Sequence, residues 1–357
     1  MKKKGSFIYI FLIIFFIVSI STIYSAQGIL SSYYSNLYIK QIIWYIVGFV
    51  FMLIINRIGK SYVYKICFFI YIVLNILLLG LLFFGNYVNG ARCWYNILGF
   101  GFQPSEFMKI TLIILIGVMI NNYNKKKNHT NDDEFKLILS VFVITLIPSI
   151  LTFLEPDTGN VIIYFIIMVS MLFTSGINKK WFIFMFLILF IFIFGMLIFY
   201  HYFNDLFIKI LGSSFSLRLN RIFSWKNLSG YQLTNGLSSI GSAGLFGYGF
   251  RKTPLYFPEA QTDFIFAVFA SNYGFIGSFL LICLIMIFDL KLINLAYKKH
   301  GITKYVIIGM VSMMFYQQFQ NIGMTIGILP ITGITLPFIS YGGSSLISYF
   351  IILAFCI

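Results

Sequence analysis

The ten acidic residues carry most of the information about chemistry in this chain. Five of them lie beside proline in three compact motifs: Gln103-Pro-Ser-Glu106, Glu155-Pro-Asp157-Thr-Gly159 and Pro258-Glu259-Ala-Gln-Thr-Asp263. A carboxylate that is partly removed from water has a raised pKa and can accept a proton near neutral pH. The motifs are therefore candidates for general acid–base chemistry.

Asp263 is the strongest candidate for a general base. It lies where a long polar stretch meets the apolar run that begins at Phe264, so we expect its carboxyl group to be partly desolvated. The alternative is structural, because aspartate at the start of a helix commonly caps the helix N-terminus. The residues alone leave both interpretations open.

Lys109 is a charged residue inside an apolar run, one helical turn after Glu106. A charge deep in a membrane helix costs about 2.5–3.5 kcal/mol on insertion scales, so such a lysine usually faces a cavity or a partner. The i, i+3 spacing allows Glu106 and Lys109 to pair on one helix face. Either the two residues form a simple interfacial ion pair, or they bind substrate in a polar outer cavity.

The composition excludes a soluble protein. Hydrophobic residues make up 60% of the 357 positions and charged residues 10%, and the mean hydropathy is +0.92. A soluble domain carries about 25% charged residues, so this chain has too little polar surface to face water. We expect an all-α integral membrane protein with a single polytopic domain over residues 1–357.

The net charge of +15 does not indicate nucleic-acid binding, because the basic residues cluster at helix ends as topology signals do. The four cysteines show no CxxC spacing and the three histidines are scattered, so neither a metal site nor a disulfide is predicted. These residues are Cys67, Cys93, Cys283, Cys356, His129, His201 and His300.

Apolar runs of about 20 residues predict ten membrane-spanning helices. Lys and Arg concentrate in alternate short connections, which places the N- and C-termini in the cytoplasm. On this topology Asp132, Asp133, Glu134 and Asp289 fall in solvated cytoplasmic loops, and the inner halves of the helices are almost wholly apolar. The expected spans are 6–24, 41–55, 63–84, 104–120, 137–154, 159–176, 181–201, 264–288, 304–320 and 345–357.

Two outer segments differ from ordinary connections. Residues 202–262 form a long extracellular loop between the seventh and eighth spans, and its Gly and aromatic content argues against disorder. Residues 321–345 are too broken by Gly and Pro for a spanning helix and too apolar for a solvated loop. We expect a re-entrant segment there, which dips into the membrane from outside and lines a cavity.

Several motifs together resemble the SEDS family (shape, elongation, division and sporulation), whose members include RodA, FtsW and SpoVE. The resemblance spans nearly the whole chain, and its last block is highly specific. The matching motifs, in order, are Gly90-Ala-Arg-Cys-Trp94, Gln103-Pro-Ser-Glu-Phe-Met-Lys109, Glu155-Pro-Asp-Thr-Gly159, Gly230-Tyr-Gln232, Gly241-Ser-Ala-Gly-Leu-Phe-Gly247, Pro258-Glu-Ala-Gln-Thr-Asp-Phe-Ile-Phe-Ala267 and Leu329-Pro-Ile-Thr-Gly-Ile-Thr-Leu-Pro-Phe-Ile-Ser-Tyr-Gly-Gly-Ser-Ser345.

The resemblance implies a peptidoglycan glycosyltransferase that polymerises lipid II on the outer face of the bacterial cytoplasmic membrane, with a class B penicillin-binding protein as partner. The family's catalytic aspartate corresponds to Asp263. Positive charge for the departing pyrophosphate would come from protein side chains or from a bound divalent cation, Mg²⁺ or Mn²⁺. The substrate-binding candidates are Arg92, Trp94, Glu106, Lys109, Arg218, Arg221 and Glu259.

The chain departs from the family pattern at two places. Gln261 stands where the family usually has histidine, and Ser271-Asn272 replaces a pair of glutamates. The glycine motif 244–249 favours the RodA branch slightly, whereas Glu155-Pro-Asp157 is closer to FtsW. The departures motivate one alternative function, a non-catalytic scaffold for a penicillin-binding protein. The other alternative is a lipid II flippase, which the apolar inner halves of the helices disfavour.

The topology is open to a direct test. A cysteine introduced into the 202–262 loop should react with a membrane-impermeant thiol reagent on intact cells, because the loop lies outside. Labelling is compared with that of the parent chain, and protection of the new cysteine would contradict the assigned orientation.

Overall fold

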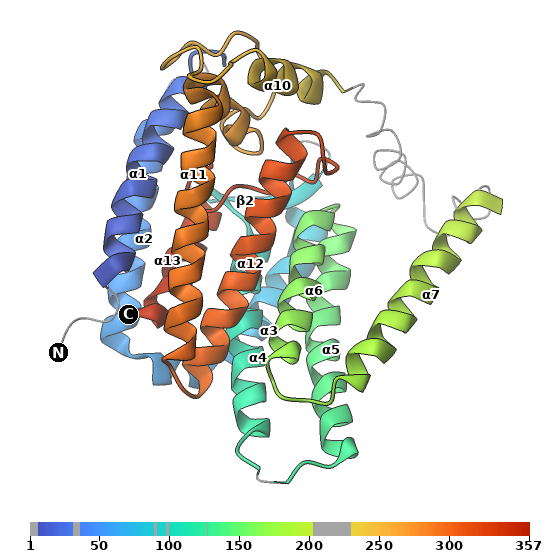
Figure 1. Cartoon of the computed structure of the whole chain (residues 1–357). Helices are drawn as coiled ribbons and strands as arrows, with labels where there is room; N and C mark the ends of the chain where they lie inside the picture. The colour runs from blue at the N-terminus through green and yellow to red at the C-terminus, as the bar shows by residue number, and fades with distance from the viewer. Residues whose placement is uncertain (1–5, 31–35, 89–90, 98–99, 127, 203–229) are drawn as a thin grey trace.

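Long runs of Ile, Leu and Phe form helices because only a helix satisfies all its backbone polar groups within one segment in lipid. The computed structural model describes residues 6–30, 36–88, 91–97, 100–126, 128–202 and 230–357, which are predominantly helical (Figure 1). The helices of these residues are α1 (Ser6–Ala26), α2 (Leu37–Ile58), α3 (Lys60–Phe84), α4 (Pro104–Tyr123), α5 (Asn131–Leu154), α6 (Thr158–Phe173), α7 (Lys180–Tyr202), α10 (Tyr231–Gly241), α11 (Ile265–Tyr297), α12 (Ile302–Thr325), α13 (Gly343–Leu353) and the 3₁₀ turn η3 (Ala354–Cys356).

A helix overlaps each of the ten predicted spans. Among the described residues, α1, α2, α3, α4, α5 and α11 are long and apolar enough to cross a membrane. α4 lies inside the bundle, packed against α3, α6 and α12, and most of its side chains are buried. α7 leans away from the other helices (Figure 1). Exposed apolar side chains such as Phe69 and Ile76 suit contact with lipid.

A small antiparallel sheet follows α3, in a stretch for which the sequence analysis proposed no strands. Its strands are β1 (Asn86–Val88), β2 (Ala91–Ile97) and β3 (Phe100–Phe102), in the order β1-β2-β3. Trp94 pairs with Asn86 on one side of β2, and Tyr95 pairs with Phe102 on the other. The sheet leads directly into α4 and so holds β2 beside the start of that helix.

The predicted re-entrant segment is shorter than expected. α12 continues to Thr325 and α13 begins at Gly343, so the irregular part is 326–342, called here the connecting segment. It is buried among the helices at Leu336 and Phe338. Side chains bond its main chain: the carbonyls of Pro330, Ile334, Phe338, Ile339 and Ser340 accept from Gln320, Asn321, Tyr45, Ser19 and Gln41, respectively.

The prediction that Asp289 lies in a solvated cytoplasmic loop was wrong. α11 continues to Tyr297, and Asp289 is buried within it, where Oδ1 accepts a hydrogen bond from Gln318 Nε2 of α12 at 3.4 Å. The apolar run ended at Asp289 in the sequence, but a polar partner on the next helix lets α11 bury this residue. The interior of the bundle is therefore not wholly apolar at this depth.

α11 is broken at Gly274, where the backbone has φ +65°. The glycine motif 244–249 pairs with this break: Tyr248 N and Gly249 N donate to the carbonyls of Ser271 and Asn272, and the N–H groups of residues 275 and 276 donate back to carbonyls of the motif. Gly247 and Gly274 pack backbone against backbone. A Cβ on Gly247 would lie 2.3 Å from the Asn272 carbonyl oxygen, so neither glycine leaves room for a side chain.

Gly247→Ala should destabilise the protein more than Gly244→Ala. Both glycines have positive φ, so alanine costs about 1–3 kcal/mol of backbone strain at either position. Only at Gly247 does the new methyl group meet backbone atoms, which adds about 1–3 kcal/mol. Thermal unfolding of the detergent-purified variants measures the difference. Equal midpoints would show that the two segments can separate at little cost.

Candidate active site

Asp263 lies in the turn that precedes α11 and is half-buried. The residue at the N-cap position of α11 is Phe264, and no side chain caps this helix, so the capping interpretation of Asp263 was wrong. The carboxylate faces the connecting segment, where a Cβ on Gly333 would lie 3.6 Å from Asp263 Oδ2. The carboxylate of Asp263 is thus not occupied in capping α11.

Burial and two neighbouring carboxylates raise the proton affinity of Asp263. Burial raises the pKa of Asp263 to about 7, with smaller contributions from the negative charges of Glu259 and Asp157. Glu259 has φ +54° and accepts hydrogen bonds at Oε2 from Thr262 Oγ1 (2.6 Å) and Gln261 Nε2 (3.3 Å). A carboxyl group with a pKa near 7 is suited to exchange protons at neutral pH.

The carboxyl groups of the Glu155-Pro-Asp157 motif have different environments. Asp157 Oδ1 accepts from Asn160 N at 3.1 Å and so caps α6, and Oδ2 accepts from Asn160 Nδ2 (2.7 Å) and Gln103 Nε2 (3.0 Å). Glu155 is fully buried, and neither carboxylate oxygen has a hydrogen-bond partner among the described residues. Burial, followed by the charge of Asp157, raises the pKa of Glu155 to about 9, so this side chain is neutral at pH 7.

The predicted pairing of Glu106 with Lys109 is confirmed. Lys109 Nζ donates to Glu106 Oε1 at 2.7 Å, with the lysine side chain fully buried and the glutamate side chain 8% exposed. The pair lies in the first turns of α4, the most buried of the six described helices that are long and apolar enough to cross a membrane. A role of the pair in substrate binding stays a prediction.

Arg92 and Trp94 lie on β2. The Arg92 side chain is exposed, and Nη1 donates to the Leu82 carbonyl at 3.2 Å. Between them, Cys93 Sγ donates to the Glu155 carbonyl at 3.1 Å and joins the sheet to the end of α5. The structure thus groups Asp157, Glu259 and Asp263, and places Arg92 and Trp94 on the sheet beside the Glu155 motif. Arg218 and Arg221 lie outside the described residues.

Asn272 has a structural role in this chain. Its Nδ2 donates to Ser25 Oγ of α1, and its Oδ1 accepts from Thr253 Oγ1 at 3.1 Å. The residue is buried, so a glutamate at this position would place a charge among neutral partners. Gln261 bonds Glu259 through its side chain and accepts from Tyr341 N at 2.9 Å through its carbonyl.

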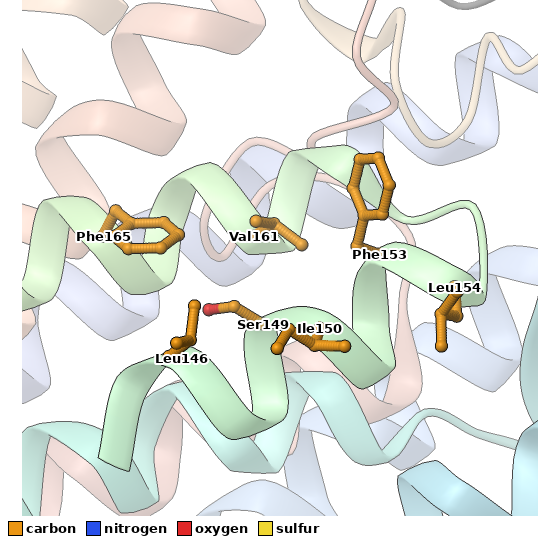
Figure 2. Close-up of a pocket in the computed structure, with 7 residues that line it drawn as sticks. All are labelled: Leu146, Ser149, Ile150, Phe153, Leu154, Val161 and Phe165. Atoms are coloured by element: carbon orange, nitrogen blue, oxygen red, sulfur yellow. The ribbon is translucent and has the colours of Figure 1, made fainter. Parts of the chain in front are cut away.

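No three His, Cys, Asp or Glu side chains of the described residues lie close enough together to hold a metal ion. A pocket between α5 and α6 contains none of the predicted site residues (Figure 2). Its lining is apolar apart from Ser149: Leu146, Ile150, Phe153, Leu154, Val161 and Phe165.

Asn321 is a site residue that the sequence analysis did not identify as functional. It stood at the start of the predicted re-entrant segment, but nothing in the residue types around it distinguished it from the neighbouring amides. The structure buries Asn321 in α12 and bonds it to the main chain of Asp263. This contact joins residues 58 positions apart, which local patterns do not reveal.

Comparison with known proteins decides the family. A family model described as a cell cycle protein, FtsW/RodA/SpoVE, matches residues 5–357. The chain belongs to this family. These are the SEDS proteins that the motifs indicated, and membership together with the apolar helices makes the chain a multi-pass protein of the cytoplasmic membrane.

Relatives of known sequence support the assignment. The chain is 36% identical over 298 residues to a protein named "Probable peptidoglycan glycosyltransferase FtsW" from Wigglesworthia glossinidia brevipalpis, covering 80% of this chain and 74% of that protein. It is 33% identical to stage V sporulation protein E of Bacillus subtilis, covering 79% and 73%. In each case the aligned region covers most of this chain and most of the relative.

Solved structures share the fold of this SEDS chain. The RodA crystal structure from Thermus thermophilus aligns with a TM-score of 0.69 and 22% identity over 97% of this chain and 93% of that one. A chain from a peptidoglycan synthase complex, described for its structural coordination of polymerization and crosslinking, aligns with a TM-score of 0.74 and 23% identity over 96% and 94%. The fold is therefore RodA-like. The branch within the family stays a prediction.

Removal of Lys109 should be costly because it leaves Glu106 buried without its partner. Lys109→Met should lower the free energy of unfolding by about 3–5 kcal/mol, whereas the double variant Glu106→Gln/Lys109→Met should recover most of that loss. Thermal unfolding of both variants and of Glu106→Gln completes the double-mutant cycle. If the double variant is no more stable than Lys109→Met, the two charges are not coupled.

Proposed function

We propose that this chain polymerises lipid II into glycan strands on the outer face of the membrane, with Asp263 as the general base. The chain is a peptidoglycan glycosyltransferase of the SEDS family and acts in cell-wall synthesis. One observation carries the proposed role of Asp263. It is a half-buried carboxyl group with a pKa near 7 that leaves its helix uncapped and faces a glycine.

The proposed chemistry needs a base and a means of stabilising the leaving group. Asp263 removes the proton from the 4-hydroxyl of the acceptor sugar, and that oxygen then attacks the anomeric carbon of the donor with inversion. The bond from this carbon to the pyrophosphate breaks, and negative charge develops on the departing group. Exposed Arg92 on β2 offers a guanidinium that can meet a phosphate in a bidentate manner.

Other proposed substrate contacts follow the family motifs. Trp94 presents a half-buried aromatic ring on the same strand as Arg92. Glu259 lies beside the base and keeps its proton affinity high. Glu106 and Lys109, being largely buried, shape the wall of the site from α4. Arg218 and Arg221 complete the proposed set.

We also propose ten membrane spans with both termini in the cytoplasm. The ten helices that overlap the predicted spans support this count. The acidic motifs then lie toward the outer side, together with the 202–262 loop. The connecting segment 326–342 enters the bundle from that side and lines the site, as broken segments do when they border a cavity.

The proposed partner is a class B penicillin-binding protein, which would cross-link the product. The similarity of fold to a chain from a peptidoglycan synthase complex supports this partner. The alternative of a non-catalytic scaffold is favoured by the neutral network around Asn272, since acids expected there are missing. A scaffold would bind the partner equally well but form no glycan, so the polymerisation assay separates the two functions.

The base should be visible in the pH dependence of polymerisation. The rate with labelled lipid II should fall about tenfold for each pH unit below 7, because only the deprotonated carboxylate accepts a proton. Asp263→Asn should form no glycan strands at any pH.

Glu259→Gln removes the negative charge that helps to raise the pKa of Asp263, so the acid limb of the pH–rate profile of this variant should move to lower pH.

Three outcomes of this assay are informative. Full activity of Asp263→Asn would exclude Asp263 as the base. If Asp263→Asn is inactive but the acid limb of the pH–rate profile does not move in Glu259→Gln, the limb reports the titration of another group. No product from the parent protein, with the partner and divalent cations present, would favour the scaffold.

A further inference from the structure

Asn321 joins two segments of the site with one side-chain amide. Its Nδ2 donates to the Asp263 carbonyl at 2.9 Å and to the Ile334 carbonyl at 2.7 Å. The residue belongs to α12 and is fully buried. Its side-chain amide is therefore fixed by the helix backbone that carries it and by the two carbonyls that it bonds. The two segments that it bonds are not continuous with each other in the chain.

The two bonded segments meet at the Asp263 carboxylate. One carries Asp263, and the other carries Gly333, where a Cβ would lie 3.6 Å from Asp263 Oδ2. A second set of bonds joins the same segments further along: Ser340 Oγ donates to the Thr262 carbonyl at 2.6 Å, and Tyr341 N donates to the Gln261 carbonyl at 2.9 Å. Among the hydrogen bonds of the described residues that join these two segments, only that of Asn321 reaches the main chain of Asp263 itself.

The connecting segment also packs against the start of α6. A Cβ on Gly159 would lie 3.0 Å from both the Thr332 carbonyl oxygen and a side-chain carbon of Ile334. The segment therefore has little room to move toward α6. Asn321 links the segment to Asp263, because it bonds both the Asp263 carbonyl and the Ile334 carbonyl.

We propose that Asn321 is a positioning residue for glycosyl transfer, which holds the Asp263 carboxylate at a set distance from the connecting segment. The proposal rests on the proposed function of Asp263 as the base. Loss of one buried amide–carbonyl bond has a modest effect on stability. The effect on rate is larger, because a misplacement of about 1 Å at a reacting group can cost about 100-fold.

Gln320 provides a matched control on the same helix. Its Nε2 donates to the Pro330 carbonyl at 2.8 Å, so it anchors the same connecting segment. No hydrogen bond described for Gln320 reaches the turn that carries Asp263. Asn321→Leu and Gln320→Met each replace an amide by an apolar side chain of similar size. Both variants lose an anchor of the connecting segment, but only Asn321→Leu loses the contact with Asp263.

The test compares these two variants of the full chain in polymerisation of labelled lipid II, with Asp263→Asn alongside. Asn321→Leu should lower kcat about 100-fold while KM stays within about threefold, since the amide positions the base and does not touch substrate. Gln320→Met should keep both constants within about threefold of the parent. Thermal unfolding should show similar losses of stability in the two variants.

Asn321→Ala is included because its shorter side chain leaves room for a water molecule between the two carbonyls. It should fold and show a smaller loss of kcat than Asn321→Leu. Equal kcat for Asn321→Leu and Gln320→Met, a loss confined to KM, or failure of both Asn321 variants to fold would each overturn the positioning role.

The outcomes separate this proposal from the assignment of the base. If Asp263→Asn is active, the base is wrong, whatever Asn321 does. If Asp263→Asn is inactive and Asn321→Leu behaves like Gln320→Met, Asp263 remains the base and only the positioning role fails.

Discussion

The arrangement of this molecule depends on satisfying the main chain of one irregular segment inside a helical membrane protein. The connecting segment 326–342 has no helix of its own to bond its carbonyls, and lipid offers no water to do so. Amide and hydroxyl side chains of α1, α2 and α12 take that place, among them Ser19, Gln41 and Gln320. The positions of these helices are therefore constrained by the carbonyls that their side chains must reach. The connecting segment in turn lies next to Asp263.

Two carboxyl groups of one short motif, those of Glu155 and Asp157, lie in different environments. Asp157 accepts hydrogen bonds from the first turn of α6 and from Gln103, whereas Glu155 is buried with no bonded partner among the described residues and is neutral at pH 7. Asp263 is half-buried, and its pKa of about 7 lies below that of Glu155. Glu155 and Asp263 therefore differ in proton affinity, which suits Asp263 and not Glu155 to proton transfer near neutral pH.

Features with a local cause were predictable from the sequence, and features that depend on packing were not. Apolar runs predicted the helices, and the i, i+3 spacing predicted the Glu106–Lys109 pair. Strands β1 and β3 are too short to leave a periodic pattern, and β2 shows no strict alternation of apolar and polar residues. Asp289 looked like a loop residue because its partner, Gln318, is on another helix. The importance of Asn321 likewise arises from tertiary contacts, since two segments distant in the chain meet at its amide.

Gly247 in the loop before α11 and Gly274 within α11 are in direct backbone contact, and a side chain on either residue would collide with the other segment. Residues 244–249 and 271–276 should therefore be exchanged together when sequences of relatives are combined. A chimaera that takes residues 244–249 from one relative and residues 271–276 from another would have to match backbone paths to within a fraction of an ångström. Loop exchange among SEDS proteins is therefore best designed with both segments transferred together, and insertions are better placed outside them.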